Sequence, residues 1–462
     1  MSEHFLDREY ELKFLEGIYK NNKSSLVILY GRRRVGKTEL ATHFANGKPS
    51  IYFLADERTD MENLKGLQES FARFLQDPLF GKAAIKDWVE LFEEFSKKIN
   101  EKAAIIIDEF PYLIKSNNAI PSIFQKIWDT NLSKKNVCLI LLGSSISMME
   151  RHTLSYQAPL YGRRSGQVEL RPLKLKYLEK FFPGRDIEDV IRFYSIVDGI
   201  PLYALKLDPK ASFTENIREN VMQVGKFLYQ EAENLLKQEL REPAKYFLIL
   251  KAIGFGRNKF GEISNFTGLD KTTVSKYLDN LLTLHIIKKD FPITQNIEAR
   301  NASYVFEDNY FNFWFRFVYP NKTFIEEHRQ KDVVNSIRTD LELYVSRIFE
   351  KVCMEVIFDL DIPIKFNKIG RWWHKDKEID VVCLDENGKE ALFIECKWAD
   401  LKEKEARKVL AELNEKSKFV DWKRKKERFG LFGKKIAGKE SLRVEGFLVW
   451  DLEDLEKVVK KA

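Results

Sequence analysis

A strand, a short glycine-containing loop and a helix follow one another near the start of the sequence. Residues 25–30 (SLVILY) are apolar and rich in β-forming residues, and residues 38–45 (TELATHFA) have helical character. Between them, the sequence GRRRVGKT fits the pattern G-x-x-x-x-G-K-[ST] in the strand–loop–helix setting that this pattern requires. The sequence therefore predicts a P-loop, and with it a parallel α/β sheet in the N-terminal part of the chain.

The chemistry of phosphate binding accounts for the residue types in this loop. Gly31 and Gly36 would let backbone N–H groups curl around phosphate oxygens at a helix N-terminus, whose dipole favours anions. Lys37 would reach the β- and γ-phosphates, and Thr38 would bind Mg²⁺ through its hydroxyl group. We thus predict ATP and Mg²⁺ as ligands. The candidate nucleotide-binding residues of the loop are Gly31, Arg32, Arg33, Arg34, Val35, Gly36, Lys37 and Thr38.

A second apolar run ends in acidic residues, as a magnesium site beside a P-loop requires. Residues 103–110 (AAIIIDEF) place Asp108 where it would complete the Mg²⁺ shell and bind the nucleotide with it. Glu109 is the candidate base for the attacking water. The chain between the P-loop and this run is long enough for two βα units, which strengthens an assignment that the run alone would not carry.

Two further segments are candidates for the same site. The apolar run VCLILLGSS ends at Ser144 and Ser145, whose hydroxyl groups would lie near the γ-phosphate or simply form a turn. Beyond it, PLYGRRSG contains Arg163 and Arg164. Arg164 is the candidate for neutralising transition-state charge, in cis or across subunits. A solvated basic loop is equally consistent with these two arginines.

Length and composition limit the class of protein. At 462 residues the chain is too long for one ordinary core and predicts roughly two to four domains. It carries 77 Lys and Arg against 70 Asp and Glu, a net charge of +7 that is compatible with nucleic acid but not diagnostic. Its apolar runs are too short to span a bilayer, and its four cysteines stand singly, as reduced buried thiols do. We therefore expect a cytoplasmic protein without membrane contact.

The middle of the chain has the spacing of a helix–turn–helix. The segments FGEISNFTGL and DKTTVSKYLDNLLTLHII would form its two helices, with Gly268 in the turn and Asp270 as a helix N-cap. An apolar stripe in the second helix leaves Lys271 and Lys276 on the open face, where a DNA groove would fit. The segments IIKKDFPI and ASYVFED would form the wing of a winged helix. A role in packing alone is an equal alternative to DNA binding.

A hairpin near the C-terminus brings two carboxylates together. If Asn387 and Gly388 form a two-residue type I′ turn, Asp380 lies opposite Glu395 and Glu378 lies opposite Lys397. Period two places all four on one face and leaves an apolar opposite face, which would point to the core.

Opposed carboxylates repel, and a bridging divalent cation removes the repulsion. The alternative is a charged outer face whose side chains extend into water, and a bulge would shift the register.

Several of these motifs resemble the archaeal ATPase family, a branch of the AAA-like STAND P-loop NTPases. FLDREYELKFL, YGRRRVGKTEL, IIIDEFPYL, GSSISMMERH, PLYGRRSGQVEL and GIPLYAL carry the resemblance, which covers roughly residues 1–235. The resemblance implies that Arg8 and Glu9 lie near the adenine of the nucleotide. It also implies that the segment around Pro201 belongs to a helical lid.

The C-terminal part is similar to the PD-(D/E)XK restriction-endonuclease-like fold over roughly residues 325–462. The sequences IGRWWHKDKEIDVV and FIECKW resemble the nuclease-like domain often fused to archaeal ATPases. By this resemblance, Asp380 and Glu395 are metal ligands, Lys397 is the catalytic lysine, and Glu350 is a further metal-binding acid on a helix. Ile379 departs from the family pattern, which has proline there.

These features predict a multidomain α/β chain: a P-loop NTPase parallel sheet with a helical lid, a winged helix and a C-terminal α/β restriction-endonuclease-like domain. The expected boundaries are residues 1–170 for the ATPase core, 171–240 for the lid, 241–320 for the winged helix and linking helix, and 321–462 for the nuclease-like domain. We predict a Mg²⁺-dependent ATPase that couples its nucleotide state to DNA binding and metal-dependent DNA cleavage. The alternative is a STAND-type signalling or transcriptional switch with a catalytically silent nuclease-like domain. ATP and DNA are the expected partners, and a homo-oligomer is compatible with the sequence.

Overall fold

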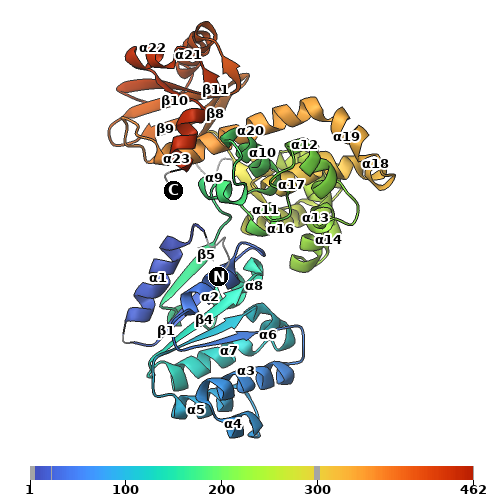
Figure 1. Cartoon of the computed structure of the whole chain (residues 1–462), viewed down its shortest axis with the longest axis vertical. Helices are drawn as coiled ribbons and strands as arrows, with labels where there is room; N and C mark the ends of the chain where they lie inside the picture. Colours follow the sequence, from blue (N-terminus) through green and yellow to red (C-terminus); the bar gives the residue numbers. More distant parts are fainter. Residues whose placement is uncertain (1–5, 22, 296–301, 461–462) are drawn as a thin grey trace. The chain divides into compact units, whose positions relative to one another are not determined.

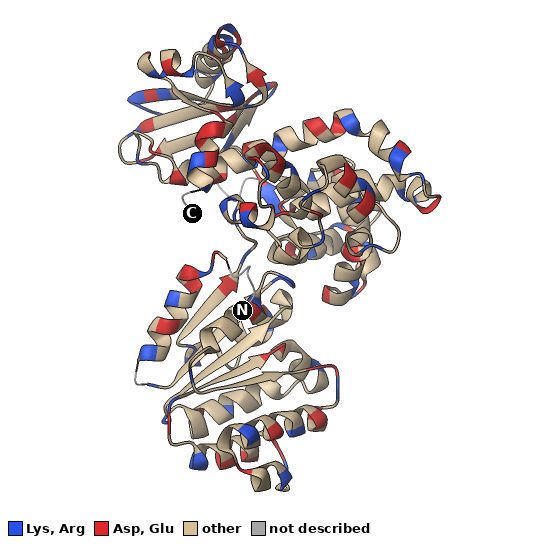
Figure 2. Ribbon diagram, viewed as in Figure 1, with Lys and Arg blue, Asp and Glu red and all other residues tan. Residues whose placement is uncertain are grey.

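A computed structural model describes residues 6–21, 23–295 and 302–460. The chain divides into two compact units, Met1–Pro172 and Leu173–Ala462, and each is described by itself (Figure 1). Lysines and arginines are interspersed with acidic residues in both units (Figure 2). Within the described residues, no helix combines the length and apolar character that crossing a membrane requires. The cysteines Cys138, Cys353, Cys383 and Cys396 are buried and free.

The first unit is built on the parallel sheet that the P-loop predicts. Its strands are β1 (Ser25–Gly31), β2 (Ser50–Leu54), β3 (Ala103–Asp108), β4 (Val137–Gly143) and β5 (Gly166–Leu170). They lie in the order β2-β3-β4-β1-β5, and every neighbouring pair is parallel. β1, β3 and β4 are buried along their whole lengths, as the continuous apolar runs indicate.

Helices precede and connect these strands. They are α1 (Glu9–Lys20), α2 (Lys37–Ala45), α3 (Asp60–Leu75), α4 (Pro78–Lys82), α5 (Trp88–Lys98), α6 (Phe110–Ser116), α7 (Ile120–Ile127) and α8 (Ile146–Met149). Aromatic side chains join several of them: Phe124 contacts the rings of Phe92 and Phe110 at centroid distances of 5.6 and 5.1 Å. Because this layer is well packed, the strand ends are held in fixed positions.

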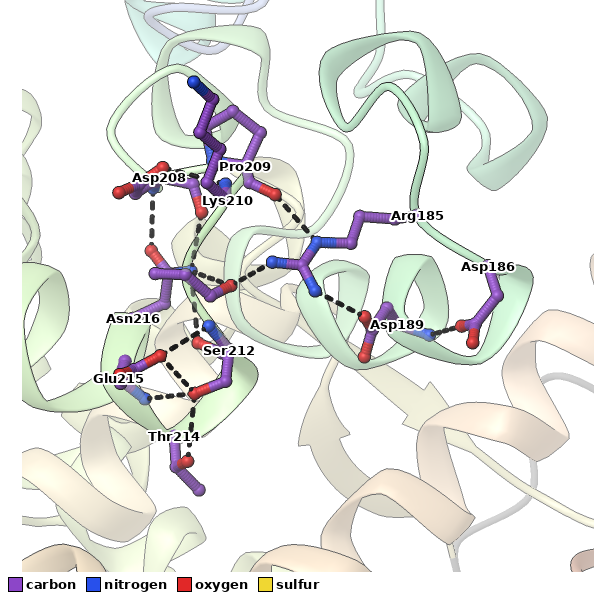
Figure 3. Close-up of polar contacts among 11 residues, drawn as sticks. Arg185, Asp186, Asp189, Asp208, Pro209, Lys210, Ser212, Thr214, Glu215 and Asn216 are labelled. Carbon is purple, nitrogen blue, oxygen red and sulfur yellow. Dashed lines mark hydrogen bonds and ion pairs between the residues drawn. The ribbon is translucent and has the colours of Figure 1, made fainter.

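The second unit begins with helices. They are α9 (Leu175–Leu178), α10 (Ile187–Val197), α11 (Pro201–Ala204), α12 (Phe213–Asn216), α13 (Phe227–Glu239), α14 (Pro243–Gly254), α15 (Phe260–Thr267), α16 (Lys271–Thr283), α17 (Asn309–Phe313), α18 (Lys322–Glu326) and α19 (Gln330–Ser336). A polar network holds the start of α10 to the loop before α12 (Figure 3). There, the Arg185 guanidinium donates to the carbonyl oxygens of Pro209 and Ala211 at 2.7 and 2.6 Å. The Asn216 side chain pairs with the Asp208 backbone in both directions.

The segment expected to bind DNA forms two helices and a hairpin. α16 starts at its predicted N-cap, because the Asp270 carboxylate accepts a hydrogen bond from the Thr273 N–H at 2.9 Å. β6 (Ile287–Asp290) and β7 (Ser303–Phe306) pair antiparallel. The loop between these strands includes residues outside the described ranges.

The chain then forms a second, mixed sheet. Its strands are β8 (Lys368–His374), β9 (Lys377–Asp385), β10 (Glu390–Leu401), β11 (Lys426–Ile436) and β12 (Leu448–Trp450), in the order β12-β11-β10-β9-β8. Its helices are α20 (Arg338–Val356), α21 (Glu403–Ser417), α22 (Lys439–Val444) and α23 (Leu452–Val459). β8, β9 and β10 are antiparallel neighbours, whereas β10, β11 and β12 run parallel.

The hairpin register is the predicted one, but the predicted turn type is wrong. Glu390 pairs with Asp385 and Ile394 with Val381, without a shift between them. Four residues, 386–389, connect the strands, and it is Lys389 that has a positive φ of 55°. The Asp385 carboxylate accepts hydrogen bonds from two backbone N–H groups of the turn, which favours the longer connection. Since this turn has the same centre as the predicted one, the register is unchanged.

The alternative of a charged outer face that extends into water is also wrong, because helices cover both faces of the sheet. Glu395 is bonded to Lys416 of α21, whereas the neighbouring Cys396 contacts Cys353 of α20. Successive residues of a strand point to opposite faces, so the two helices lie on opposite sides. Asp380 and Glu395 are 5% and 2% exposed.

Helix α20 is shared between this sheet and the preceding helices. Its Glu355 carboxylate accepts from the Leu175 N–H at 2.7 Å and from the Tyr194 hydroxyl at 3.3 Å. Its Tyr344 hydroxyl donates to the carbonyl oxygens of Ser195 and Asn309 at 2.6 and 2.9 Å. α20 therefore packs on both parts of the second unit.

Candidate functional site

The predicted P-loop connects β1 to α2. Gly36 is the N-cap of α2 with φ +95°, a conformation that favours glycine. The Lys37 ammonium donates to the carbonyl oxygens of Gly31 and Arg32 at 2.9 and 2.8 Å, so its positive charge is held inside the loop. Thr38 follows on the first turn of α2. The loop thus ends at a helix N-terminus, where the backbone dipole attracts phosphate.

Gly31 has a reason to be glycine that the sequence did not reveal. A Cβ at this position would collide with the carbonyl oxygen of Leu170 on β5, which lies directly alongside β1. Its φ is +148°. Glycine therefore lets two strands approach at the start of the loop, in addition to the expected role in phosphate binding.

The two predicted Mg²⁺ ligands lie in contact. The Thr38 hydroxyl donates to the Asp108 carboxylate at 2.6 Å, and Asp108 is 2% exposed. Tyr52, in the middle of the neighbouring strand β2, donates to the same carboxylate oxygen at 2.7 Å. Burial and the hydrogen bond to Asp108 raise the pKa of the Tyr52 hydroxyl. Hydroxyl and carboxylate oxygens are ligands that suit Mg²⁺, so this pair fits the ion.

Glu109 and Ser144 meet across neighbouring strands. The Ser144 hydroxyl donates to the Glu109 carboxylate at 2.6 Å. Glu109 has φ +54°, a strained conformation for this residue, and it caps α6. The sequence places both residues at strand ends, but it did not predict that they bond one another. The candidate base is thus positioned by the end of β4.

Arg8, in the same unit, is buried and links two segments of the chain through hydrogen bonds. Its guanidinium donates to the carbonyl oxygens of Val35 and Arg171 at 3.0 and 2.9 Å, and it lies 3.4 Å from Glu11. Burial lowers the pKa of Arg8, against the opposing effect of Glu11. Arg8 therefore joins the N-terminal helix to the P-loop and to the chain after β5. Its expected place beside an adenine remains a prediction.

The remaining residues of the P-loop differ in burial, backbone conformation and hydrogen bonding. Arg32 and Val35 are buried, Arg34 has φ +72°, and Arg33 donates to the Tyr112 hydroxyl at 3.4 Å.

The candidate transition-state arginine is bonded within its own loop. Arg164 donates to the carbonyl oxygens of Tyr161 and Leu154 and to the Gln167 side chain. Its guanidinium also lies 4.9 Å from the Tyr161 ring centroid. The neighbouring Arg163 is paired with Asp129 at 2.8 Å. A catalytic role for Arg164 stays a prediction and would require these bonds to break.

A second polar site lies in the C-terminal sheet. The Lys397 ammonium is 2.7 Å from a carboxylate oxygen of Glu395 and 4.0 Å from Asp380. Lys416 bonds the other oxygen of Glu395 at 2.7 Å. Asp380 accepts a hydrogen bond from the Cys396 N–H at 2.8 Å. The structure thus brings together three of the residues predicted here, and adds Lys416, which the hairpin pattern did not indicate.

The pKa values of the two carboxyl groups of this site are shifted in opposite directions. Burial, together with the neighbouring carboxylates of Glu395 and Glu350, raises the pKa of Asp380 to about 8. Burial also acts on Glu395, but the ammonium groups of Lys397 and Lys416 outweigh it and lower the pKa of that carboxyl. The predicted solvated alternative is therefore wrong: these carboxylates are buried and interact with one another.

Glu350, the fourth predicted residue, lies on α20 and pairs with Arg371 at 3.4 Å. Burial raises the pKa of Glu350, while Arg371 opposes this. Glu378 also approaches Arg371, at 3.5 Å, and pairs across to Trp373 of β8. Its predicted partner Lys397 bonds Glu395 instead. Within the described ranges, no group of three His, Cys, Asp or Glu side chains is arranged to hold a metal ion. The metal-binding roles of Glu350, Asp380 and Glu395 stay predictions.

Known proteins are similar in sequence to both units of this chain. The family described as "ATPase domain predominantly from Archaea" matches residues 5–207. An uncharacterized protein of Methanocaldococcus jannaschii is 39% identical over 454 residues, which cover 97% of this chain and 99% of the relative. The chain belongs to this archaeal ATPase-domain family. Its first unit is a nucleotide-binding ATPase domain, as the P-loop predicts.

Three further similarities cover smaller parts of the chain. An uncharacterized ATP-binding protein of M. jannaschii is 54% identical over 44 residues, 10% of this chain and 75% of that protein. A Walker-type ATPase of Pyrococcus abyssi has a similar structure with a TM-score of 0.50 and 22% identity, covering 67% of this chain and 95% of that one. This likeness shows the fold. The family described as "Archaea bacterial proteins of unknown function" matches residues 314–409.

Proposed function

We propose that this archaeal ATPase-domain protein hydrolyses ATP with Mg²⁺ and couples its nucleotide state to the binding and metal-dependent cleavage of DNA. In the first unit, Thr38 and Asp108 would hold the ion, which would neutralise charge on the phosphates. When ATP binds, the Lys37 ammonium would give up its hydrogen bonds to the carbonyl oxygens of Gly31 and Arg32 and bond the phosphates instead. Glu109 would accept the proton of the attacking water, and its bond to Ser144 fixes the carboxylate.

The elements α15, α16, β6 and β7 support a winged-helix assignment. The exposed face of α16 carries Lys271 and Lys276, and these residues border a shallow hollow together with Thr272 and Ser275. Cations and hydroxyl groups of this kind contact phosphates. DNA binding through α16 is therefore the proposed role of this segment.

The observation that carries the cleavage proposal is the buried constellation of Asp380, Glu395 and Lys397. Burying two carboxylates so close together is costly, and a surface hairpin would avoid it. A divalent cation on Asp380 and Glu395 would lower the pKa of a bound water and hold the scissile phosphate. Lys397 would then stabilise developing charge.

A second candidate function is a nucleotide-driven switch whose C-terminal site is catalytically silent. It is favoured by the lysine bonds to both oxygens of Glu395, which neutralise this carboxylate without a metal. In this case, Asp380 would stay protonated and the constellation would be structural.

Incubation with DNA distinguishes the two. Wild type, Asp380→Ala and the matched control Glu412→Ala are mixed with supercoiled, linear and branched DNA, with Mg²⁺ or Mn²⁺, with and without ATP. Glu412 lies exposed on α21, so its loss should change nothing. The proposal expects cleavage by wild type and by the control, and none by Asp380→Ala. Equal background cleavage by all three would leave the switch as the function, with ATP hydrolysis unaffected.

A further inference from the structure

A cavity of about 710 Å³ lies inside the second unit, next to the acidic site. Its walls come from the end of α14, the hairpin β6–β7, the segment 309–316, helix α20, and strands β8 and β9. Seven Lys or Arg side chains and four Asp or Glu side chains line it, so cations exceed anions by three. The cavity is therefore a positively charged space between the hairpin and the C-terminal sheet.

The acids of this cavity are concentrated around one arginine. Arg371 lies 3.4 Å from Glu350, 3.7 Å from Asp290 and 3.5 Å from Glu378. The fourth acid, Asp376, is 4.0 Å from Lys377 and largely exposed. Most of this negative charge is thus already paired, and Lys351 has its own partner in Asp198 at 3.6 Å, so the lining acids leave Arg316, Arg347 and Lys288 largely uncompensated.

Arg316 and Arg347 are the two cations for which this matters most. The segments that carry them are packed together through Phe317 and Tyr344, whose rings meet at 5.4 Å. Arg316 is half-buried and Arg347 is exposed at the cavity. Among the ion pairs of the described residues, none joins either guanidinium, or the ammonium of Lys288 on β6, to a carboxylate within 4.0 Å. Burial and the neighbouring Arg347 lower the pKa of Arg316, so the pair repels itself and a bound anion would relieve this.

The cavity adjoins the proposed cleavage site through Glu350, which lines it. Arg347 and Glu350 are three residues apart on α20, so both side chains lie on one face of that helix. Glu350 interacts electrostatically with both Asp380 and Lys397. Two buried polar atoms of lining residues, the Arg371 Nε and the Asn258 Oδ1, have no hydrogen-bond partner. A polar ligand in this space would satisfy them.

We propose that this cavity binds the phosphodiester backbone of a nucleic acid strand, with Arg316, Arg347 and Lys288 as phosphate contacts. The inference rests on the proposed function, because the strand that enters here is the one that reaches Lys397. Guanidinium groups suit phosphate oxygens, which they bind in a bidentate manner. The three cations come from β6, the segment 309–316 and α20, so they line the cavity from separate elements, as contacts to successive phosphates require.

Binding is measured with wild type and Arg316→Gln/Arg347→Gln. Lys408→Gln/Lys418→Gln serves as a control that removes two exposed lysines on and just after α21. Fluorescence anisotropy of labelled 30-nucleotide single strands and duplexes is followed in EDTA over a range of salt concentrations. We expect the cavity variant to bind at least roughly ten-fold more weakly than the control. A plot of log affinity against log salt concentration has a negative slope. The magnitude of this slope should decrease by about 1.4 for single strands or about 1.8 for duplexes, since two phosphate contacts are lost.

Each other outcome has a definite meaning. Equal binding by the cavity and control variants overturns the cavity inference, and the proposed DNA function survives. An absence of nucleic acid binding by wild type overturns the proposed function and the cavity inference with it. Competition by a short dinucleotide as strong as that by the 30-nucleotide strand also overturns the inference, because a free dinucleotide would then be the ligand.

Circular dichroism and ATP turnover verify folding of the cavity variant. If it does not fold, Lys288→Gln on the exposed edge of β6 replaces it. This variant should weaken binding uniformly across sequences and lower the salt slope by about 1, and an unchanged slope would overturn the inference.

Discussion

The buried carboxyl group of Asp380 makes the pH dependence of stability a direct test of the acidic site. Burial and the carboxylates of Glu395 and Glu350 raise its pKa from 3.8 to about 8. Between these values the folded chain holds a proton that the unfolded chain has released, so folding is favoured at low pH and the free energy of unfolding falls as pH rises. Linkage gives about 1.4 kcal/mol per pH unit, or about 3 kcal/mol between pH 5 and pH 7.

The variant Asp380→Asn removes this titration while keeping the shape and the carbonyl acceptor for the Cys396 N–H. Urea unfolding in EDTA at pH 5, 6 and 7 should show the difference between variant and wild type shifting by about 3 kcal/mol in favour of the variant. The cost of burying an amide is the same at each pH and cancels from this shift. Glu412→Gln, an exposed acid on α21, should follow the wild type throughout.

Addition of Mg²⁺ at pH 7 then separates a metal site from a silent one. A cation on Asp380 favours the ionised carboxylate and should stabilise wild type but leave Asp380→Asn unchanged. Parallel pH profiles of wild type and variant in EDTA would refute the argument from burial. An equal effect of Mg²⁺ on both proteins would refute the metal role of Asp380.

Three further predictions concern the ATPase unit. Lys37→Ala should abolish ATP turnover, because the loop loses the cation predicted to contact the phosphates, and full turnover in a phosphate-release assay would remove the P-loop assignment. Glu109→Gln keeps an acceptor for the Ser144 hydroxyl and should lower ATP turnover by about 10²-fold or more. ATP binding, measured by calorimetry, should be retained. Turnover equal to that of wild type would show that another group is the base. Arg8→Ala leaves the carbonyl groups of Val35 and Arg171 without their donor and should destabilise the unit by about 3 kcal/mol, seen as faster hydrogen exchange around both residues. Unchanged exchange with weaker ATP binding would instead place Arg8 at the nucleotide.

The sequence was most informative where local rules act alone. The P-loop fixed the strand–loop–helix and the parallel sheet, because its residues need that setting. The hairpin register followed from the position of its turn, and the N-cap of α16 followed from Asp270.

What the sequence did not predict depends on contacts between distant residues. No periodicity indicates that Tyr52 bonds Asp108, that Ser144 bonds Glu109, or that Lys416 bonds Glu395. The turn type was missed because the Asp385 side chain, rather than Asn387 and Gly388, determines it. The hairpin face was missed because α21 covers it.

The double attachment of α20 bears on how this chain evolves. A domain joined by a flexible linker can be exchanged between proteins or lost, because no packed surface is exposed when it leaves. Here, Glu355 and Tyr344 of α20 satisfy backbone groups of the preceding helices, while the same helix contributes Glu350 to the C-terminal sheet. The family that matches residues 314–409 begins before this helix and ends inside α21, in keeping with that packing. Loss or exchange of the C-terminal sheet would therefore strip the middle of the chain of its packing, and the two parts should be inherited together.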